Sequence, residues 1–297
     1  MNKIDVRLSK PFPSQRPELQ QAALKPSLPG DMQRKLGLWE RVADHAGFRR
    51  AVVLLTLVLA WEAYARHLGN PLLLPTFIET LAAFWQATLD GTLPDRIATS
   101  LRVLAMGYIA GILLAGLFTG IAVSTRAGAD TLSTLTAMFN PLPAIALLPL
   151  ALLWFGLGAP SIVFVIVHSV LWPVSLNAMT GFLSVPDVQR MVGRNYGLRG
   201  FRFLLLILVP AAFPSILAGL KIGWAFAWRT LIAAELVFGV SSRSGGLGWF
   251  IYENRAQLET ASVFAGLLAV ILIGLIVDNI VFRTIETHTV RKWGMQR

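Results

Sequence analysis

Residues 186–210, PDVQRMVGRNYGLRGFRFLLLILVP, lie between two long apolar stretches of this 297-residue chain. The stretch carries four arginines, and a charged side chain is expensive to place in the hydrocarbon core of a membrane. We therefore expect it to stand in water, as a soluble element between two membrane spans. Proline fits the first turn of a helix and aspartate the positive end of its dipole, so Pro186-Asp187 predicts a helix start.

This first helix is expected to run through Val188–Tyr196 and to end at Gly197, which can adopt the left-handed conformation of a helix C-terminus. Residues 201–209 form a second amphipathic stretch that leads to Pro210, at the mouth of the next span. The sequence thus predicts two short helices joined by residues 197–200. They would project from the membrane with four basic side chains: Arg190, Arg194, Arg199 and Arg202.

The composition is that of an integral membrane protein. Mean hydropathy is +0.62, and 55% of the residues are hydrophobic while only 14% are charged, which is outside the range of ordinary soluble domains. The charges are also segregated. Residues 1–50 contain ten Lys and Arg, whereas residues 103–125 and 131–186 contain no charged residue.

Six apolar segments are long enough to cross a bilayer, which takes about 20 residues. They define a predicted all-α transmembrane domain at 49–285, with spans at about 49–68, 100–124, 132–156, 160–183, 211–238 and 260–283. The third and fourth spans are separated only by the tight hairpin at 156–160. No internal repeat related by inversion is visible, which disfavours a secondary transporter built from such repeats.

Orientation follows from the distribution of Lys and Arg, which are enriched in cytoplasmic segments. With six spans, the tail 1–48, the turn at Arg126, the loop 186–210 and the tail 286–297 all fall on one side. Both termini are therefore expected in the cytoplasm, with the 1–30 region disordered and 33–47 either an interfacial helix or a solvated linker. The net charge of +10 reflects these segments and does not indicate nucleic-acid binding.

The third span contains the prolines of Asn140-Pro-Leu-Pro-Ala144, together with Pro149. Proline removes a backbone donor and kinks a helix, which a membrane helix tolerates where neighbours or a water-lined cavity satisfy the freed carbonyls. Two interpretations stay open. Asn140, Pro141 and Pro143 either break a helix that lines a translocation path, or they kink a helix for packing.

Ionisable residues at membrane depth are candidate functional residues. Arg229 would attract an anionic solute in a cavity, or would pair with Glu235 or Asp278. For Glu235 a structural or gating role is expected, and Lys221 is expected to extend toward the cytoplasmic face. His168 is either a hydrogen-bonded structural residue or a proton carrier. Trp154 is the last candidate for the translocation path. Because it is an aromatic residue in a span, it could equally serve packing.

Catalytic and metal-binding chemistry is not indicated. The chain has no cysteine, which excludes thiol nucleophiles, disulfides and Cys-based metal sites. No pair of carboxylates or Ser-His-Asp set emerges, and the four histidines are scattered over separate segments. We therefore expect a non-catalytic protein without a metal site.

Several spaced motifs resemble those of permease subunits of binding-protein-dependent ABC importers. In that family the pattern Glu-Ala-Ala-x3-Gly-x9-Ile-x-Leu-Pro precedes a span; here Gly197, Ile207 and Pro210 keep the spacing, while Met191-Val-Gly193 and Val209 depart from it. The resemblance is strongest to the aliphatic sulfonate, taurine and nitrate/bicarbonate group. It rests there on PLPAIALLP at 141–149, LWFG at 153–156, RNYG at 194–197 and AAEL at 233–236.

This resemblance implies a type I importer permease of the bacterial inner membrane. Two copies would pair as a homodimer with two cytoplasmic ATPases and a periplasmic solute-binding protein. ATP would be bound by the ATPase, since this chain has no Gly-x4-Gly-Lys-Ser/Thr loop. A coupling helix at 187–200 would dock on the ATPase, and Gly193 would allow close approach of the ATPase backbone. The residues implied in coupling are Arg190, Met191, Gly193, Arg194, Asn195, Tyr196, Gly197 and Leu198, and the structural motif residues are Ile207, Pro210, Pro214 and Gly219.

The resemblance also implies a solute class, a small anion such as a sulfonate, taurine, nitrate or bicarbonate. An aromatic acid, or a precursor of a cofactor or pyrimidine, is the alternative within the same group. A stand-alone secondary transporter and a membrane-embedded enzyme are the rival hypotheses from other classes.

Overall fold

The computed structural model describes residues 46–237 and 245–292, and every regular element in these ranges is a helix. The predicted helix at 33–47 lies almost wholly outside the described residues, as does the tail before it. The chain divides into two units, residues 1–59 and 60–297. Of the first unit the structure describes 46–59, the first part of α2, which runs from Ala46 to Leu68.

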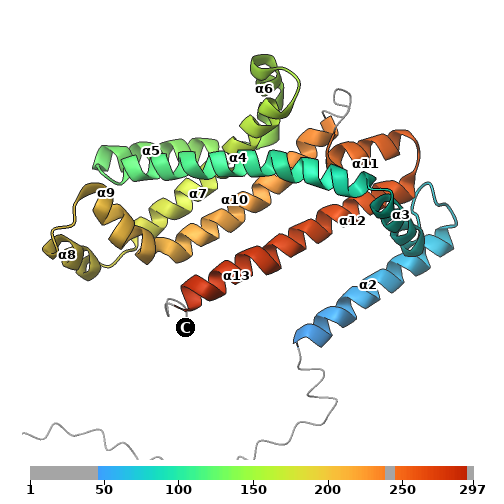
Figure 1. Cartoon of the computed structure of the whole chain (residues 1–297), viewed down its shortest axis with the longest axis horizontal. Coiled ribbons are helices and arrows are strands. Elements are labelled where there is room, and N and C mark those ends of the chain that lie inside the picture. The colour runs from blue at the N-terminus through green and yellow to red at the C-terminus, as the bar shows by residue number, and fades with distance from the viewer. Residues whose placement is uncertain (1–45, 238–244, 293–297) are drawn as a thin grey trace, which may run out of the picture. The chain divides into compact units, whose positions relative to one another are not determined.

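The second unit continues with helices of very different lengths (Figure 1). They are α3 (Phe77–Leu89), α4 (Thr92–Ala122), α5 (Arg126–Phe139), a 3-10 turn (Ala144–Leu147), α6 (Leu148–Phe155), α7 (Ala159–Leu183), α8 (Asp187–Asn195), α9 (Gly200–Phe203), a π-helical segment (Leu204–Leu208), α10 (Val209–Val237), α11 (Leu247–Ala256) and α12 (Thr260–Ile276). The last helix goes on through a π-helical segment (Val277–Phe282), α13 (Arg283–Glu286) and another π-helical segment (Thr287–Arg291).

Five continuous helices of the described ranges are long and apolar enough to cross a membrane: Gly47–Leu68, Thr92–Ala122, Ala159–Leu183, Gly200–Val237 and Thr260–Val290. A sixth span results if the bent pair Arg126–Phe139 and Ala144–Phe155 counts as one. The predicted all-α membrane fold is confirmed. The bounds differ from expectation: α4 begins at Thr92 instead of about 100, and the last helix continues to Arg291 instead of ending near 283.

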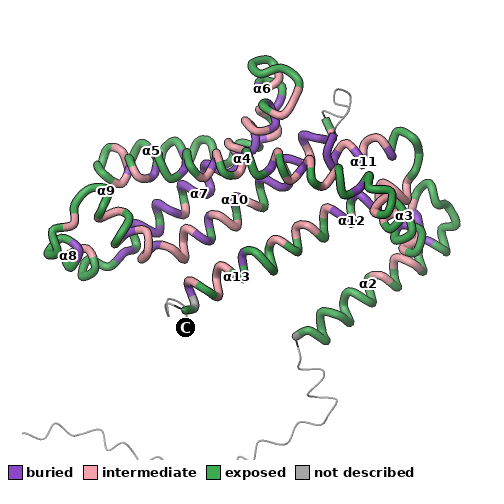
Figure 2. The backbone as a smooth tube through the Cα atoms, viewed as in Figure 1, coloured by how far each residue is buried: buried purple, intermediate pink, exposed green. Residues whose placement is uncertain are grey.

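Helix α7 is the centre of the bundle and packs against both α4 and α10 (Figure 1). Buried residues follow α7 and one side of α10, whereas α5 is mostly exposed (Figure 2). The helices approach closely because small residues stand where they cross, as is usual in membranes. A Cβ added at Gly107 or Gly111 of α4 would lie 2.6 Å or 2.7 Å from Ile166 or Val170 of α7.

On the other side of α7, an added Cβ at Gly219 of α10 would lie 2.7 Å from Cβ of Asn177. Helices α4 and α10 are joined directly as well, since the Tyr108 hydroxyl donates a hydrogen bond of 2.9 Å to the carbonyl of Leu220. Gly219, a motif residue at sequence level, is thus a packing residue in the fold.

Lys221 forms an ion pair with the last helix. Its Nζ lies 2.6 Å from a carboxylate oxygen of Glu286, so that α10 is tied to the last helix by an ion pair. A small cluster of Leu217, Phe282 and Val290 surrounds this contact. The lysine therefore holds two helices together instead of extending freely to the membrane surface.

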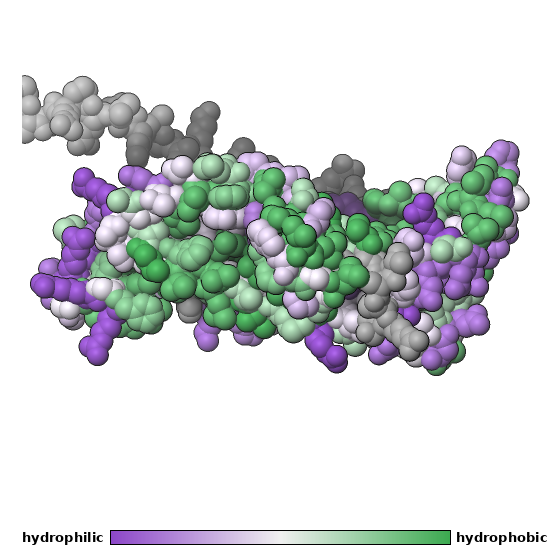
Figure 3. Space-filling model, turned by 90° about the horizontal axis from the view of Figure 1, so that it is seen from above, coloured by the Kyte–Doolittle hydropathy of each residue, from purple (hydrophilic) through white to green (hydrophobic). Residues whose placement is uncertain are grey.

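The hydropathy of the surface fits a membrane protein in which the ends of the helices stand in water. On the face seen in Figure 3, hydrophobic side chains cover the middle of the helices, and hydrophilic ones gather toward both ends of the view. One of these ends is where α8 lies in Figure 1, and α3 and α11 lie toward the other.

The substitution Gly111→Leu is expected to destabilise the bundle, because its Cβ would meet Val170 at 2.7 Å and a backbone carbonyl at 3.3 Å. Overpacking of this kind costs about 1–3 kcal/mol. The melting temperature of the purified protein in detergent, followed by tryptophan fluorescence, should fall. Gly116→Leu is the matched control, since nothing lies within 4 Å of its Cβ position on the same helix; equal melting temperatures for the two variants would contradict the packing role.

Candidate functional site

Helix α8 is a short, separately capped helix between the ends of α7 and α10 (Figure 1). Gly197 adopts φ +74°, as expected. The amide of Leu198 donates to the carbonyl of Gly193 at 3.1 Å, and that of Gly197 donates to Arg194 at 2.9 Å. This is the Schellman arrangement, in which a left-handed residue lets two otherwise unpaired carbonyls accept hydrogen bonds. The end of α8 is therefore well defined.

The predicted second short helix at 201–209 is wrong as a separate element. The chain is helical without interruption from Gly200 to Val237. The π-helical segment 204–208 directly precedes Pro210, whose ring would clash with the carbonyl of residue 206 in a regular α-helix. The changed backbone geometry lets the helix continue, so the loop outside the membrane helices is shorter than expected.

Gly193 does not face outward. It is buried, and an added Cβ would lie 2.8 Å from Ile207 and 2.9 Å from Phe203. The glycine thus permits close approach of this chain's own π-helical segment, and it is not left free to meet an ATPase. The motif residue Ile207 is its packing partner.

Arg190 also contacts its own chain. Its Nε donates a hydrogen bond of 3.1 Å to the carbonyl of Val185, and its Nη2 donates to the carbonyl of Phe182, at the C-terminal end of α7. The remaining residues implied in coupling present an open surface. The exposed side chains of α8 and its cap are Asp187, Val188, Gln189, Met191, Val192, Arg194, Asn195 and Tyr196, the last with 82% of its surface accessible.

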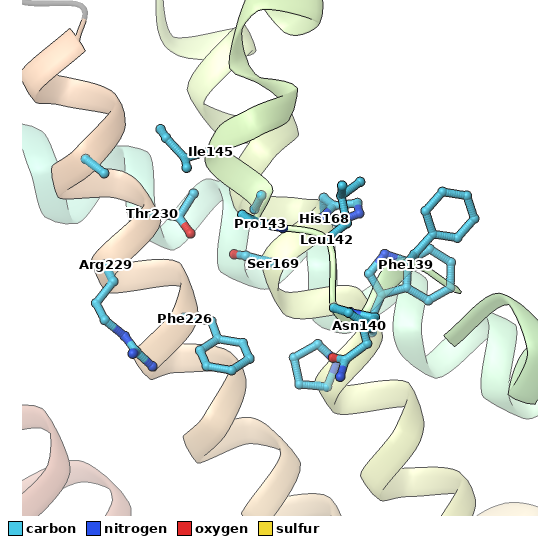
Figure 4. A pocket seen from close by; sticks show the side chains of 15 residues that line it. Phe139, Asn140, Leu142, Pro143, Ile145, His168, Ser169, Phe226, Arg229 and Thr230 are labelled. Atoms are coloured by element: carbon cyan, nitrogen blue, oxygen red, sulfur yellow. The ribbon is translucent and has the colours of Figure 1, made fainter. Parts of the chain in front are cut away.

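A cavity of about 390 Å³ lies between α10, α7 and the break that follows α5 (Figure 4). The break bends the chain by 87° between α5 and the following helical pair. The break itself lines the cavity through residues 140–143, and two of its four residues are prolines without an N–H. The prolines therefore produce a broken helix beside a cavity and not a kink between packed helices.

Aromatic and polar groups share this cavity. Phe139 and Trp172 stack with their ring centroids 5.1 Å apart, and His168 meets both rings edge-on. Both ring nitrogens of His168 and Nε1 of Trp172 are buried without a hydrogen-bond partner among the described residues. Buried polar groups are seldom left unpaired, so these three nitrogens are an exception in the wall of the cavity.

Arg229 supplies the positive charge of the cavity (Figure 4). Its Nε donates to the carbonyl of Ala225 at 2.9 Å, and its guanidinium lies 5.0 Å from the ring centroid of Phe226. Within the described ranges no carboxylate forms an ion pair with it, so the alternative of a partnership with Glu235 or Asp278 is not what the structure contains. The side chain is exposed.

Glu235 lies outside the cavity lining, in a buried network near the C-terminal end of α10. Only 5% of its surface is accessible. The Ser100 hydroxyl donates to its carboxylate at 2.8 Å and accepts from the amide of Leu247 at 2.8 Å, while the Gly248 amide donates to Glu235 at 2.8 Å. The network joins α4, α10 and α11, as expected for a structural role.

Five of the seven residues predicted for the translocation path line this one cavity: Asn140, Pro141, Pro143, His168 and Arg229. Trp154 is not among the residues that line it; it is 57% exposed and contacts Phe155 and Phe164. Glu235 does not line it either. Lining residues that were not among these candidates include Phe139, Ser169, Trp172, Phe226 and Thr230. Helical spacing could have found some of them, because 226 and 230 flank 229 on one face and 172 lies one turn after 168.

No group of three or more His, Asp or Glu that could hold a metal ion occurs in the part of the chain that the structure describes.

The substitution Ser100→Ala is expected to loosen α11, because the buried amide of Leu247 loses its acceptor and Glu235 loses a donor. Such a loss costs about 1–3 kcal/mol. Amide hydrogen exchange of Leu247 and Gly248 should accelerate by about tenfold or more in the detergent-solubilised protein. The exposed Ser133→Ala is the control, and unchanged exchange in Ser100→Ala would refute the bracing role.

Comparison with known proteins identifies the family. Residues 107–284, more than half of the chain, match the model for the binding-protein-dependent transport system inner membrane component. A putative ABC transporter permease of Methanocaldococcus jannaschii is 32% identical over 229 residues, which is 75% of this chain and 84% of that protein. The taurine transport system permease TauC of Escherichia coli is 30% identical over 75% of this chain and 81% of its own length.

The nitrate import permease NrtB of Synechocystis is 29% identical over 78% of this chain and 86% of its own length. Family match and relatives agree with the helical membrane fold and with the motif spacing around α8. This chain belongs to the binding-protein-dependent transport system inner membrane components, the permease group of ABC transporters.

Proposed function

We propose that this chain is the permease subunit of an ATP-driven importer and that α8 couples it to a cytoplasmic ATPase. The observation that carries the proposal is the geometry of α8. It is a capped helix at the joint between two membrane helices, and its outer face exposes apolar and basic side chains that have no partner among the described residues. Exposed apolar side chains on such an element indicate a protein contact.

The complete transporter would contain two permease copies, two ATPases and a periplasmic solute-binding protein. ATP is bound and hydrolysed by the ATPases, while the permease transmits their movement and forms the path. Both termini lie in the cytoplasm, on the side of α8, in agreement with the basic residues of the loops. The chain acts in the inner membrane and catalyses no reaction itself.

The cavity beside the α5 break is the proposed solute path. Arg229 is exposed although it lies within a membrane-spanning helix, and a charge facing lipid there would cost several kcal/mol, on the order of 2.5–3.5 on insertion scales. A water-filled path lined by a second copy of the chain removes this cost. Dimerisation and solute passage thus have the same consequence for this face of α10: Arg229 faces water or a second copy of the chain instead of lipid.

We infer that the solute is a small anion, since Arg229 is the charged residue lining the cavity. The names of the relatives agree with this, because they describe permeases for taurine, nitrate, aliphatic sulfonates and bicarbonate. The binding protein that delivers the solute would make the finer selection among these anions.

An aromatic acid is the second candidate, and a specific observation favours it. The cavity has three aromatic residues, Phe139, Trp172 and Phe226, beside its one arginine. Flat rings stack on such side chains, and the carboxylate of an aromatic acid would meet the guanidinium. Cofactor and pyrimidine precursors with an acidic group fit the same description.

The substitution Gly197→Val is expected to uncouple ATP hydrolysis from solute uptake. A β-branched residue is strained at φ +74°, by on the order of 1–3 kcal/mol, so the cap of α8 would be lost while the spans remain inserted. The measurement is uptake and hydrolysis in proteoliposomes containing the transporter with its ATPase and binding protein. Leu183→Val is the control, because it places the same branched side chain at an exposed residue outside α8 and its cap.

Normal uptake by Gly197→Val at the normal ratio of ATP to solute would refute the coupling role of α8. Uptake by the permease alone, without ATP or an ATPase, would instead favour the stand-alone secondary transporter.

The substitution Arg229→Gln is expected to reduce uptake of the delivered anion by about tenfold or more, the effect of losing one charge-assisted hydrogen bond. Uptake assays with the binding protein loaded with taurine, nitrate or benzoate should decide between the two solute classes, and Trp172→Leu should impair only an aromatic solute. Arg126→Gln, outside the cavity, is the control. Unimpaired uptake in Arg229→Gln would exclude the arginine from the path.

A further inference from the structure

Helix α8 is joined to two different membrane helices at two separate points. One point is the side chain of Arg190, which reaches the end of α7. The other is the buried Gly193, which lies against the π-helical segment that continues into α10. Positions 190 and 193 are one helical turn apart, so both contacts come from the inner face of the same short helix.

The contact with α7 is directional and charged. Arg190 donates to the carbonyls of Phe182 and Val185, which flank the last residue of α7. Carbonyls at a helix C-terminus lack intrahelical partners and carry the negative end of the dipole, so a guanidinium there is favourable. Because its planar fork holds two acceptors at once, the arginine resists both displacement and rotation of α8 against α7.

The contact with α10 is steric. With no side chain at Gly193, the backbone of α8 rests on Phe203 and Ile207, and any Cβ would overlap them. Because this contact consists of packing alone, α8 can displace α10 by moving toward it but cannot draw α10 along by moving away. The Schellman cap keeps α8 rigid between the two points, because the amide of Leu198 bonds back to Gly193 itself.

We propose that Arg190 is the positioning residue that makes α7 follow the movement of α8, so that α7 and α10 turn as one body during transport. Without this residue α8 would still press on α10 through Gly193 but would no longer hold α7. The inference rests on the proposed coupling function and adds the route by which movement enters the bundle. It also means that Arg190 contacts α7 and is not part of the surface that would contact the ATPase.

The absence of native cysteine allows a clean spectroscopic test. Gln189→Cys on α8 and Leu183→Cys at the end of α7 are both exposed and would carry spin labels, with the permease assembled with its ATPase and binding protein. Dipolar broadening in the continuous-wave EPR spectrum reports the distance between the labels. In the otherwise native chain it should stay unchanged when ATP is added, because α8 and α7 move together.

In the Arg190→Ala background the broadening should change on ATP addition, and the ATP hydrolysed per solute transported should rise by about tenfold, the effect of losing charge-assisted hydrogen bonds. Arg126→Ala is the control, an exposed arginine outside α8 and its contacts, and should keep the native spectrum. Arg190→Lys keeps the charge but lacks the fork. It should fold and give an intermediate ratio, which guards against a variant that simply misfolds.

An ATPase-bound Arg190→Ala transporter with the native spectrum and the native ratio would overturn this inference alone. Failure of the unsubstituted permease to associate with any ATPase would overturn the proposed function, and this inference with it.

Discussion

The close crossing of α7 with α4 and α10 is the constraint on which the rest of the structure depends. In lipid the hydrophobic effect does not drive helices together, so association relies on packing and on polar contacts. Gly107 and Gly111 bring α4 onto α7, and Gly219 brings α10 onto it, at separations that no side chain would permit. The cavity lies beside this tight group, at the proline break that follows α5.

The two ends of α10 are secured in different ways, one by a polar network and the other by packing. At the end that leads to α11, the buried carboxylate of Glu235 accepts from Ser100 and Gly248. At the other end, α8 sits against the π-helical segment and is tied to α7 by Arg190. A helix fixed at both ends by contacts with its neighbours can pass a rotation from one side of the membrane to the other without bending. This arrangement suits a subunit that must relay work done by another protein.

Local signals allowed the sequence to predict much of this fold. Long apolar runs predicted the membrane helices, and the glycine at position 197 predicted the end of α8. Both features depend on neighbouring residues in the sequence alone. What depends on tertiary contact was not predictable. The helix is continuous over 200–237 only because it contains a π-helical segment, and no local sequence pattern predicts that segment. The burial of Gly193 depends on contacts with Phe203 and Ile207. The cavity was only partly foreseen, since its aromatic residues look like ordinary packing residues in a span.

The partners of α10 also set an order of events during biosynthesis. The helix carries Lys221 and Glu235, and each charge is costly in the bilayer until it is paired. Ser100 is already made when Glu235 emerges from the ribosome, but the amide of Gly248 and the carboxylate of Glu286 follow only later in the chain. The fifth span therefore enters the membrane incompletely satisfied and is stabilised after synthesis of the last one. Truncation near the C-terminus would leave Lys221 unpaired and expose the nascent permease to membrane quality-control proteases.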